Sequence, residues 1–106
     1  MDSKTLLKLE IIKNAILESS DTTRIILFGS YAQGNETDES DLDLCVITDE
    51  NKRKREILRD IRRAIVDEAN IPVDIFIYRS DEFEQKAAIE NSFEHIIKES
   101  GITLHG

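Results

Sequence analysis

The chain has no tryptophan, a single cysteine and a single proline, and no apolar run approaches the roughly 18 residues that span a membrane. One cysteine excludes an internal disulfide, and the place of Cys45 in the apolar run 44–47 is typical of a small buried hydrophobe. The first residues also lack the charged and then apolar segment of a signal peptide. We therefore expect a cytoplasmic protein without membrane contact.

Basic residues are scarce relative to acidic ones, with 14 lysines and arginines against 22 aspartates and glutamates. The resulting net charge of -8 repels a phosphate backbone, so direct binding of nucleic acid is not expected. A length of 106 residues is enough for a hydrophobic core but too short for two domains. The prediction is a single domain over 1–106.

The apolar residues follow helical and strand periods in turn, which predicts an α/β (α+β) chain. Helices are expected over 4–19 and 30–33, from a cap at Asp49 or Asn51 to about Ala69, and from a cap at Ser80 or Asp81 to Gly101. Strands are expected over 24–28, 41–47 and 73–78. The tail 102–106 has no clear pattern, so the prediction is a small sheet of about three strands flanked by helices.

The order of these elements also predicts the topology of the sheet. If the turn after the first strand lies beside the start of the second, those two strands run antiparallel. The second and third strands are joined by a helix, which favours a parallel pair. The sheet is therefore predicted to be mixed, and Asp74 at the start of the third strand should lie beside Asp41 and Asp43.

The carboxylates of Asp41 and Asp43 are the first sign of chemistry, because residues two apart on a strand point to the same face. Like charges held this close repel unless a divalent cation lies between them. Mg²⁺ prefers such oxygen ligands together with phosphate and water. With Asp74 the set can bind two ions about 3.5–4 Å apart, as in two-metal phosphoryl transfer, and Asp74 is placed to act as ligand or base.

The turn at Gly29 and Ser30 supplies the second part of the predicted site. A glycine lets phosphate approach the backbone, while the Ser30 hydroxyl and the N–H groups of the following short helix can donate to phosphate oxygens. The turn is thus predicted to hold the triphosphate of a nucleotide. Catalysis would consist of positioning and charge neutralisation in an in-line displacement.

These residues resemble a known signature. Gly29 and Ser30, ten intervening residues, and then Asp41-Leu42-Asp43 resemble the motif of the nucleotidyltransferase superfamily that includes DNA polymerase β. With Gly34 closing the turn, the short form is similar to the minimal nucleotidyltransferase (MNT) domains of prokaryotes. The chain departs from many of these relatives at Gln33, where they have arginine.

The resemblance implies a polymerase β-like fold with Asp41, Asp43 and Asp74 as catalytic and metal-binding residues, and with Gly29 and Ser30 as nucleotide-binding residues. It also implies a role, because MNT domains are commonly encoded beside an all-helical HEPN ribonuclease toxin, which they neutralise. Some of these type VII antitoxins transfer AMP from ATP to a tyrosine of the toxin. Larger superfamily members add a helical domain for base and acceptor, so here we expect the partner to supply the acceptor surface.

Two other functions remain open at this point. The chain can be an antitoxin that neutralises its toxin by binding alone, and the absence of arginine at Gln33 favours this alternative. It can also transfer a nucleotide to a small molecule such as an aminoglycoside, provided that a homo-oligomer builds the acceptor pocket.

A basic segment over 52–63 contains half of the lysines and arginines of the chain. The side chains of Lys52, Arg55, Arg59 and Arg62 are spaced to lie on one stripe of a helix. Such a stripe can dock an acidic partner, contact RNA held by a toxin or assist the phosphates of ATP. It is also typical of a solvated helix face.

Overall fold

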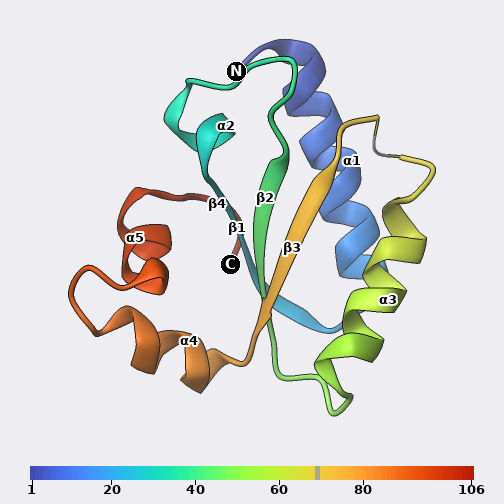
Figure 1. The fold of residues 1–106 in the computed structure, drawn as a ribbon. Helices are drawn as coiled ribbons and strands as arrows, with labels where there is room; N and C mark the ends of the chain where they lie inside the picture. The colour runs from blue at the N-terminus through green and yellow to red at the C-terminus, as the bar shows by residue number, and fades with distance from the viewer. Residues whose placement is uncertain (69) are drawn as a thin grey trace.

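The computed structural model describes residues 1–68 and 70–106 (Figure 1). In chain order its elements are α1 (Ser3–Ser19), β1 (Thr22–Phe28), α2 (Ser30–Gln33), β2 (Leu42–Thr48), α3 (Lys54–Ile65), β3 (Val73–Tyr78), α4 (Ser80–Ala87), α5 (Phe93–Ser100) and β4 (Ile102–His105). The predicted α+β class is confirmed.

The sheet has the strand order β3-β2-β1-β4. β1 and β2 are antiparallel and β2 and β3 are parallel, so the predicted mixed topology is confirmed. The strand count is four rather than about three, because β4 pairs antiparallel with the outer edge of β1. β4 has only four residues, and its pairing with β1 rather than its own sequence pattern makes it a strand.

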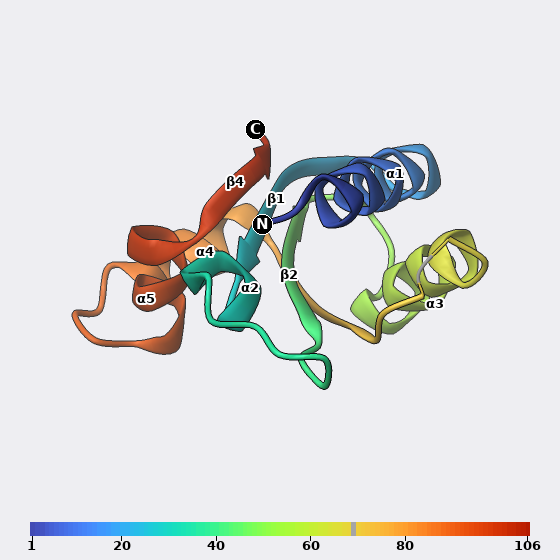
Figure 2. The ribbon, with the colours of Figure 1, turned by 90° about the horizontal axis from the view of Figure 1, so that it is seen from above.

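Helices cover both faces of the sheet (Figure 2). α1 and α3 pack on one face, over a core formed with Ile25, Leu44 and Val46. α4 and α5 pack on the other face, over Ile26 and Cys45. Because successive residues of a strand alternate between faces, β1 and β2 are apolar on both sides along most of their length.

α3 begins later than predicted, since Arg53 occupies its N-cap position in place of Asp49 or Asn51. The carboxylate of Asp49 has a different partner. It accepts hydrogen bonds from the N–H and the hydroxyl of Ser80, at 3.0 and 2.6 Å, at the start of α4. These two bonds lower the pKa of Asp49 below its usual value. A tertiary contact thus engages Asp49, which the local sequence spacing had predicted to cap α3.

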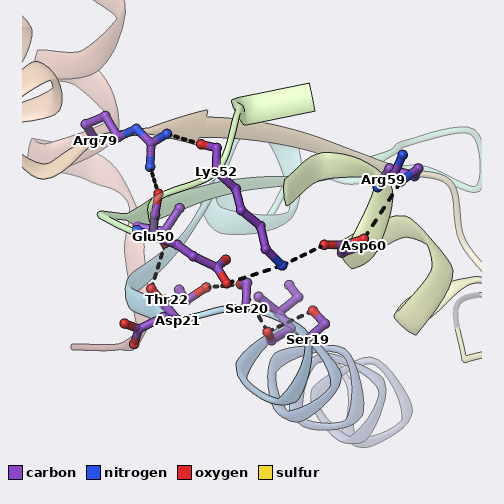
Figure 3. Close-up of polar contacts among 11 residues, drawn as sticks. Ser19, Ser20, Asp21, Thr22, Glu50, Lys52, Arg59, Asp60 and Arg79 are labelled. Carbon is purple, nitrogen blue, oxygen red and sulfur yellow. Dashed lines mark hydrogen bonds and ion pairs between the residues drawn. The ribbon is translucent and has the colours of Figure 1, made fainter. Parts of the chain in front are cut away.

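The loop before α3 is held by Arg79, the residue that directly follows β3. The guanidinium of Arg79 donates to the backbone carbonyls of Glu50 and Lys52 (Figure 3). This contact fixes where α3 starts. The end predicted for that helix, Ala69, lies outside the described residues, and α3 itself ends at Ile65.

The C-terminal helical segment is two helices, whereas the sequence pattern predicted one. α4 ends at Ala87, and α5 starts after Asn91, whose φ of 65° lies in the left-handed region that interrupts a helix. The hydroxyl of Ser92 then caps α5 by accepting from the N–H of His95 at 3.0 Å. The predicted caps of the segment, Ser80 and Asp81, are also wrong, because the N-cap position of α4 is Arg79.

Among the described residues, no helix is both long and apolar enough to cross a membrane.

The break between α4 and α5 predicts that Ser92→Ala destabilises the fold. The Ser92 hydroxyl both caps α5 and donates to the carbonyl of Lys86 at 2.7 Å, so its loss should lower the free energy of unfolding by about 1 kcal/mol. Urea denaturation measures this change. Ser100→Ala, on the exposed last turn of α5, is the matched control and should stay within about 0.5 kcal/mol of wild type. Equal effects of the two substitutions would argue against the cap.

Candidate active site

The register of β2 and β3 places two carboxylates side by side. Asp43 and Asp74 are direct partners across this parallel pair. Asp43 shares its face of β2 with Cys45, and Asp74 shares its face of β3 with Tyr78, and both of these residues pack under α4 and α5. Both carboxylates therefore point to that face of the sheet, at the end where β2 and β3 begin.

Asp41 lies one residue before β2, where that strand begins to pair with β3. The N–H of Leu42 donates to the carbonyl of Pro72 at 2.9 Å, which extends the parallel pairing by one bond. Burial raises the pKa of the Asp43 carboxyl above its usual value, and the negative charges of Asp74 and then Asp41 raise it further. The structure thus places Asp43 within electrostatic range of both Asp74 and Asp41.

The predicted turn packs directly on Asp43. A β-carbon added to Gly29 would lie 2.2 Å from Oδ2 of Asp43, so the carboxylate occupies the space that a side chain would need. Gly29 also has φ 77° and ψ -154°, a conformation that is essentially restricted to glycine. Glycine at this position is therefore required both by the backbone and by the contact.

Ser30 is the first residue of α2, directly after Gly29. Because Gly29 has no side chain, the N-cap residue of α2 does not cap the first N–H groups of the helix. Gly34 in the left-handed conformation ends α2, as predicted, and Tyr31 anchors it by packing into the core under α1 and α3. The turn is thus held rigidly while its N–H groups point away from the helix.

The carboxylates are chemically suited to a divalent cation. Asp43 and Asp74, paired across β2 and β3, offer the oxygen donors that Mg²⁺ prefers, and a cation would relieve the repulsion that helps to raise the pKa of Asp43. Within residues 1–68 and 70–106, however, no three His, Cys, Asp or Glu side chains are close enough to surround an ion by themselves. The remaining ligands would be phosphate and water, as is usual for Mg²⁺.

Aromatic side chains adjoin the carboxylates, and the sequence analysis did not include them in the site. Phe28 is the register partner of Asp43 across β1 and β2, and Phe76 follows Asp74 by two residues on the same face of β3. The alternation of Asp74, Phe76 and Tyr78 along β3 was the signal that could have indicated Phe76 as part of the site.

The basic segment makes contacts within the chain. Nζ of Lys52, which precedes α3, lies 3.4 Å from Oδ2 of Asp60 (Figure 3). Nη1 of Arg62 donates to the carbonyl of Val73 at 3.3 Å and so holds the start of β3. These contacts agree best with the interpretation of a solvated face that also supports the fold.

Cys45 is buried between the sheet and α4 and α5, as its apolar surroundings in the sequence predicted. Burial raises the pKa of its thiol to about 12, so the nucleophilic thiolate is not populated at neutral pH.

The chain is similar to known proteins in sequence and in fold. The family model described as a nucleotidyltransferase domain matches residues 9–101. The crystal structure of a toxin-antitoxin with AMP-PNP is similar with a TM-score of 0.55 and 22% identity, over 93% of this chain and 73% of that chain. A protein from Sulfolobus solfataricus assigned as a nucleotidyltransferase has a TM-score of 0.50 and 15% identity, over 97% of this chain and 86% of its own. The search of curated proteins found no match.

The fold is that of a mixed α+β domain. Since the family model spans most of its length, the chain belongs to the nucleotidyltransferase domain family. The resemblance inferred from Gly29, Ser30, Asp41 and Asp43 is thereby confirmed at the level of the family.

Asp43→Asn is expected to stabilise the metal-free protein at neutral pH. Because the pKa of Asp43 is raised in the folded chain, the folded state binds this proton more tightly than the unfolded state does. The ionised carboxylate therefore costs stability above its folded pKa, and asparagine removes that cost. Thermal unfolding without divalent cation should give a melting temperature higher by on the order of 2 °C.

The advantage of Asp43→Asn should vanish below about pH 4, where the wild-type carboxyl is protonated in both states. Asp38→Asn, in the exposed loop before β2, is the matched control and should leave the melting temperature unchanged. Mg²⁺ should then raise the melting temperature of the wild type but not of Asp43→Asn. A variant less stable than wild type at neutral pH would contradict the electrostatic argument.

The contact between Gly29 and Asp43 predicts that Gly29→Ala is more damaging than Gly34→Ala. Both glycines have positive φ, but an added β-carbon at Gly34 meets nothing within 4 Å. We expect an excess loss at Gly29 of about 1–3 kcal/mol in the free energy of unfolding, measured with urea.

A second background separates the clash from backbone strain. In Asp43→Ala the carboxylate is gone, and the remaining β-carbon would lie 3.4 Å from the new methyl, which is ordinary contact. The excess loss from Gly29→Ala should therefore shrink in this background. An unchanged loss would mean that backbone strain alone accounts for the effect.

Proposed function

We propose that the protein transfers AMP from ATP to a protein hydroxyl, and that the acceptor is a tyrosine of a cognate HEPN-type toxin. The observation that supports this most is that Asp43 packs against Gly29 and is the register partner of Asp74 on the same face of the sheet. Carboxylates and a phosphate-binding turn at one point are what nucleotidyl transfer requires. Membership in the nucleotidyltransferase family supports the same chemistry.

Each site residue has a role in the proposed reaction. Asp41 and Asp43, with Asp74, would hold Mg²⁺, whose charge would neutralise the phosphates when it is bound. Gly29 and Ser30 would orient the triphosphate through the N–H groups of α2 and the serine hydroxyl. The acceptor oxygen attacks the α-phosphorus as the bond to the β-phosphate breaks and pyrophosphate leaves. Asp74, the most exposed of the three carboxylates, is placed to take the hydroxyl proton.

The antitoxin role is supported by the resemblance to MNT domains and by the similarity in fold to a toxin-antitoxin crystallised with AMP-PNP. The ligand of that structure is a non-hydrolysable form of ATP, which agrees with ATP as substrate here. An acceptor side chain on the toxin would have to approach the exposed start of β3 beside Asp74.

Incubation with α-labelled ATP, Mg²⁺ and the protein encoded beside this chain tests the proposal. Wild type should transfer label to the partner, and Asp43→Ala should reduce the rate by at least about 100-fold, because the carboxylate lies at the centre of the site. Mass spectrometry of the product then locates AMP on the acceptor residue. Transfer by Asp43→Ala at the wild-type rate, or no transfer by wild type, would exclude the proposed catalysis. Asp38→Ala is the control and should keep full activity.

The second candidate is an antitoxin that acts by binding alone, and the residue that favours it is Gln33. This side chain is exposed on α2, where many relatives have arginine beside the phosphate-binding turn. Without that cation, phosphate binding is weaker. Neutralisation of the toxin by the double variant Asp41→Ala/Asp43→Ala would favour this candidate, whereas loss of neutralisation would favour catalysis.

A further inference from the structure

Three phenylalanines form a cluster on the face of the sheet that bears the carboxylates. Phe28 and Phe76 are edge to face with ring centroids 5.4 Å apart, and Phe28 and Phe93 are edge to face at 5.5 Å. Phe76 and Phe93 are tilted at 5.7 Å, so each ring contacts the other two. Because the contacts are mutual, the rings hold one another in fixed orientations.

The cluster directly adjoins the proposed site. Phe28 immediately precedes Gly29 and is the register partner of Asp43. Phe76 lies two residues beyond Asp74 on the same face of β3, which is about 7 Å along the strand. Phe93 begins α5, which lies on this side of the sheet (Figure 2).

The three rings differ in how far each is exposed to solvent. Phe28 is only 8% exposed and forms the base of the cluster, whereas Phe76 is 37% exposed and Phe93 is 46% exposed. Burying both rings would have been favourable, because burial removes apolar surface from water. Adjacent aromatic rings left open beside polar groups are typical of a binding surface.

We propose that the exposed ring of Phe93, with the tilted ring of Phe76 at its edge, forms a platform on which the purine ring of the bound nucleotide stacks. The inference rests on the proposed function and adds the subsite for the base, which neither the motif nor the carboxylates define. The triphosphate would lie at Gly29 and the carboxylates, and the ribose would span the distance of two strand positions from Asp74 to Phe76. Stacking on an aromatic face requires no hydrogen bond to the base, so adenine and guanine would both bind better than a pyrimidine.

Titration of the intact protein by calorimetry tests this subsite with two probes, ATP and inorganic tripolyphosphate, each with Mg²⁺. Tripolyphosphate has the phosphates but no base. Phe93→Ala should weaken ATP binding by about 5- to 30-fold and leave tripolyphosphate binding unchanged. Phe93→Tyr keeps an aromatic face and should retain the affinity for ATP, whereas Phe93→Leu keeps only the apolar surface and should lose it.

The control variant is Val66→Ala, which removes exposed apolar surface after the end of α3, the helix that covers the opposite face of the sheet. It should bind both probes as wild type does. Because the chain has no tryptophan, Phe93→Trp adds a unique fluorophore, and a stacked purine should quench its emission when ATP is added. Tripolyphosphate should leave that emission unchanged.

The outcomes separate the platform from the proposed function. If wild type binds both probes and Phe93→Ala binds ATP as tightly as wild type, the platform is excluded while the phosphate site stands. If wild type binds neither probe, the proposed function and the platform both fall. Loss of toxin binding in Phe93→Ala with full affinity for ATP would assign the rings to the protein partner and overturn the inference.

Discussion

The contact between the carboxylate of Asp43 and the α-carbon of Gly29 is the constraint on which the site depends. It requires the end of β1 to lie against the start of β2, which the antiparallel register provides. β2 also pairs in parallel with β3, and this pairing places Asp74 beside Asp43. A change in either register by one residue would turn Asp43 to the opposite face, into the core under α1 and α3. The central strand therefore positions the turn and the paired carboxylates together.

This arrangement places like charges where burial and repulsion both oppose ionisation, as the raised pKa of Asp43 indicates. Such a conflict is costly in a structural site and is common where a ligand resolves it. The two core layers supply the stability that offsets it. Apolar residues fill both sides of β1 and β2, and Tyr31 ties the turn at Gly29 and Ser30 to one of these layers. The rigid sheet thus holds groups in positions that they would not adopt alone.

Much of the fold could be predicted because the apolar pattern along each strand is strong and local. Strands at 24–28, 41–47 and 73–78 were found within a few residues, and the mixed topology followed from the connections between them. The errors occurred where a distant residue decides the outcome. Asp49 caps α4 rather than α3 because Ser80 comes within reach only in the folded chain, and β4 is a strand because β1 has a free edge. Asn91 interrupts a segment whose apolar spacing continues as if it were one helix.

The sequence alone determined the family, which the spacing of Gly29, Ser30, Asp41 and Asp43 indicated. It also determined that strand positions of one parity share a face, so that Asp43 and Asp74 could be predicted to lie side by side. Tertiary structure decided what surrounds those groups. The approach of Asp43 to Gly29 and the union of Phe28, Phe76 and Phe93 join residues from separate elements. No local pattern encodes such contacts, because they arise from strand register and from the packing of α5 on the sheet.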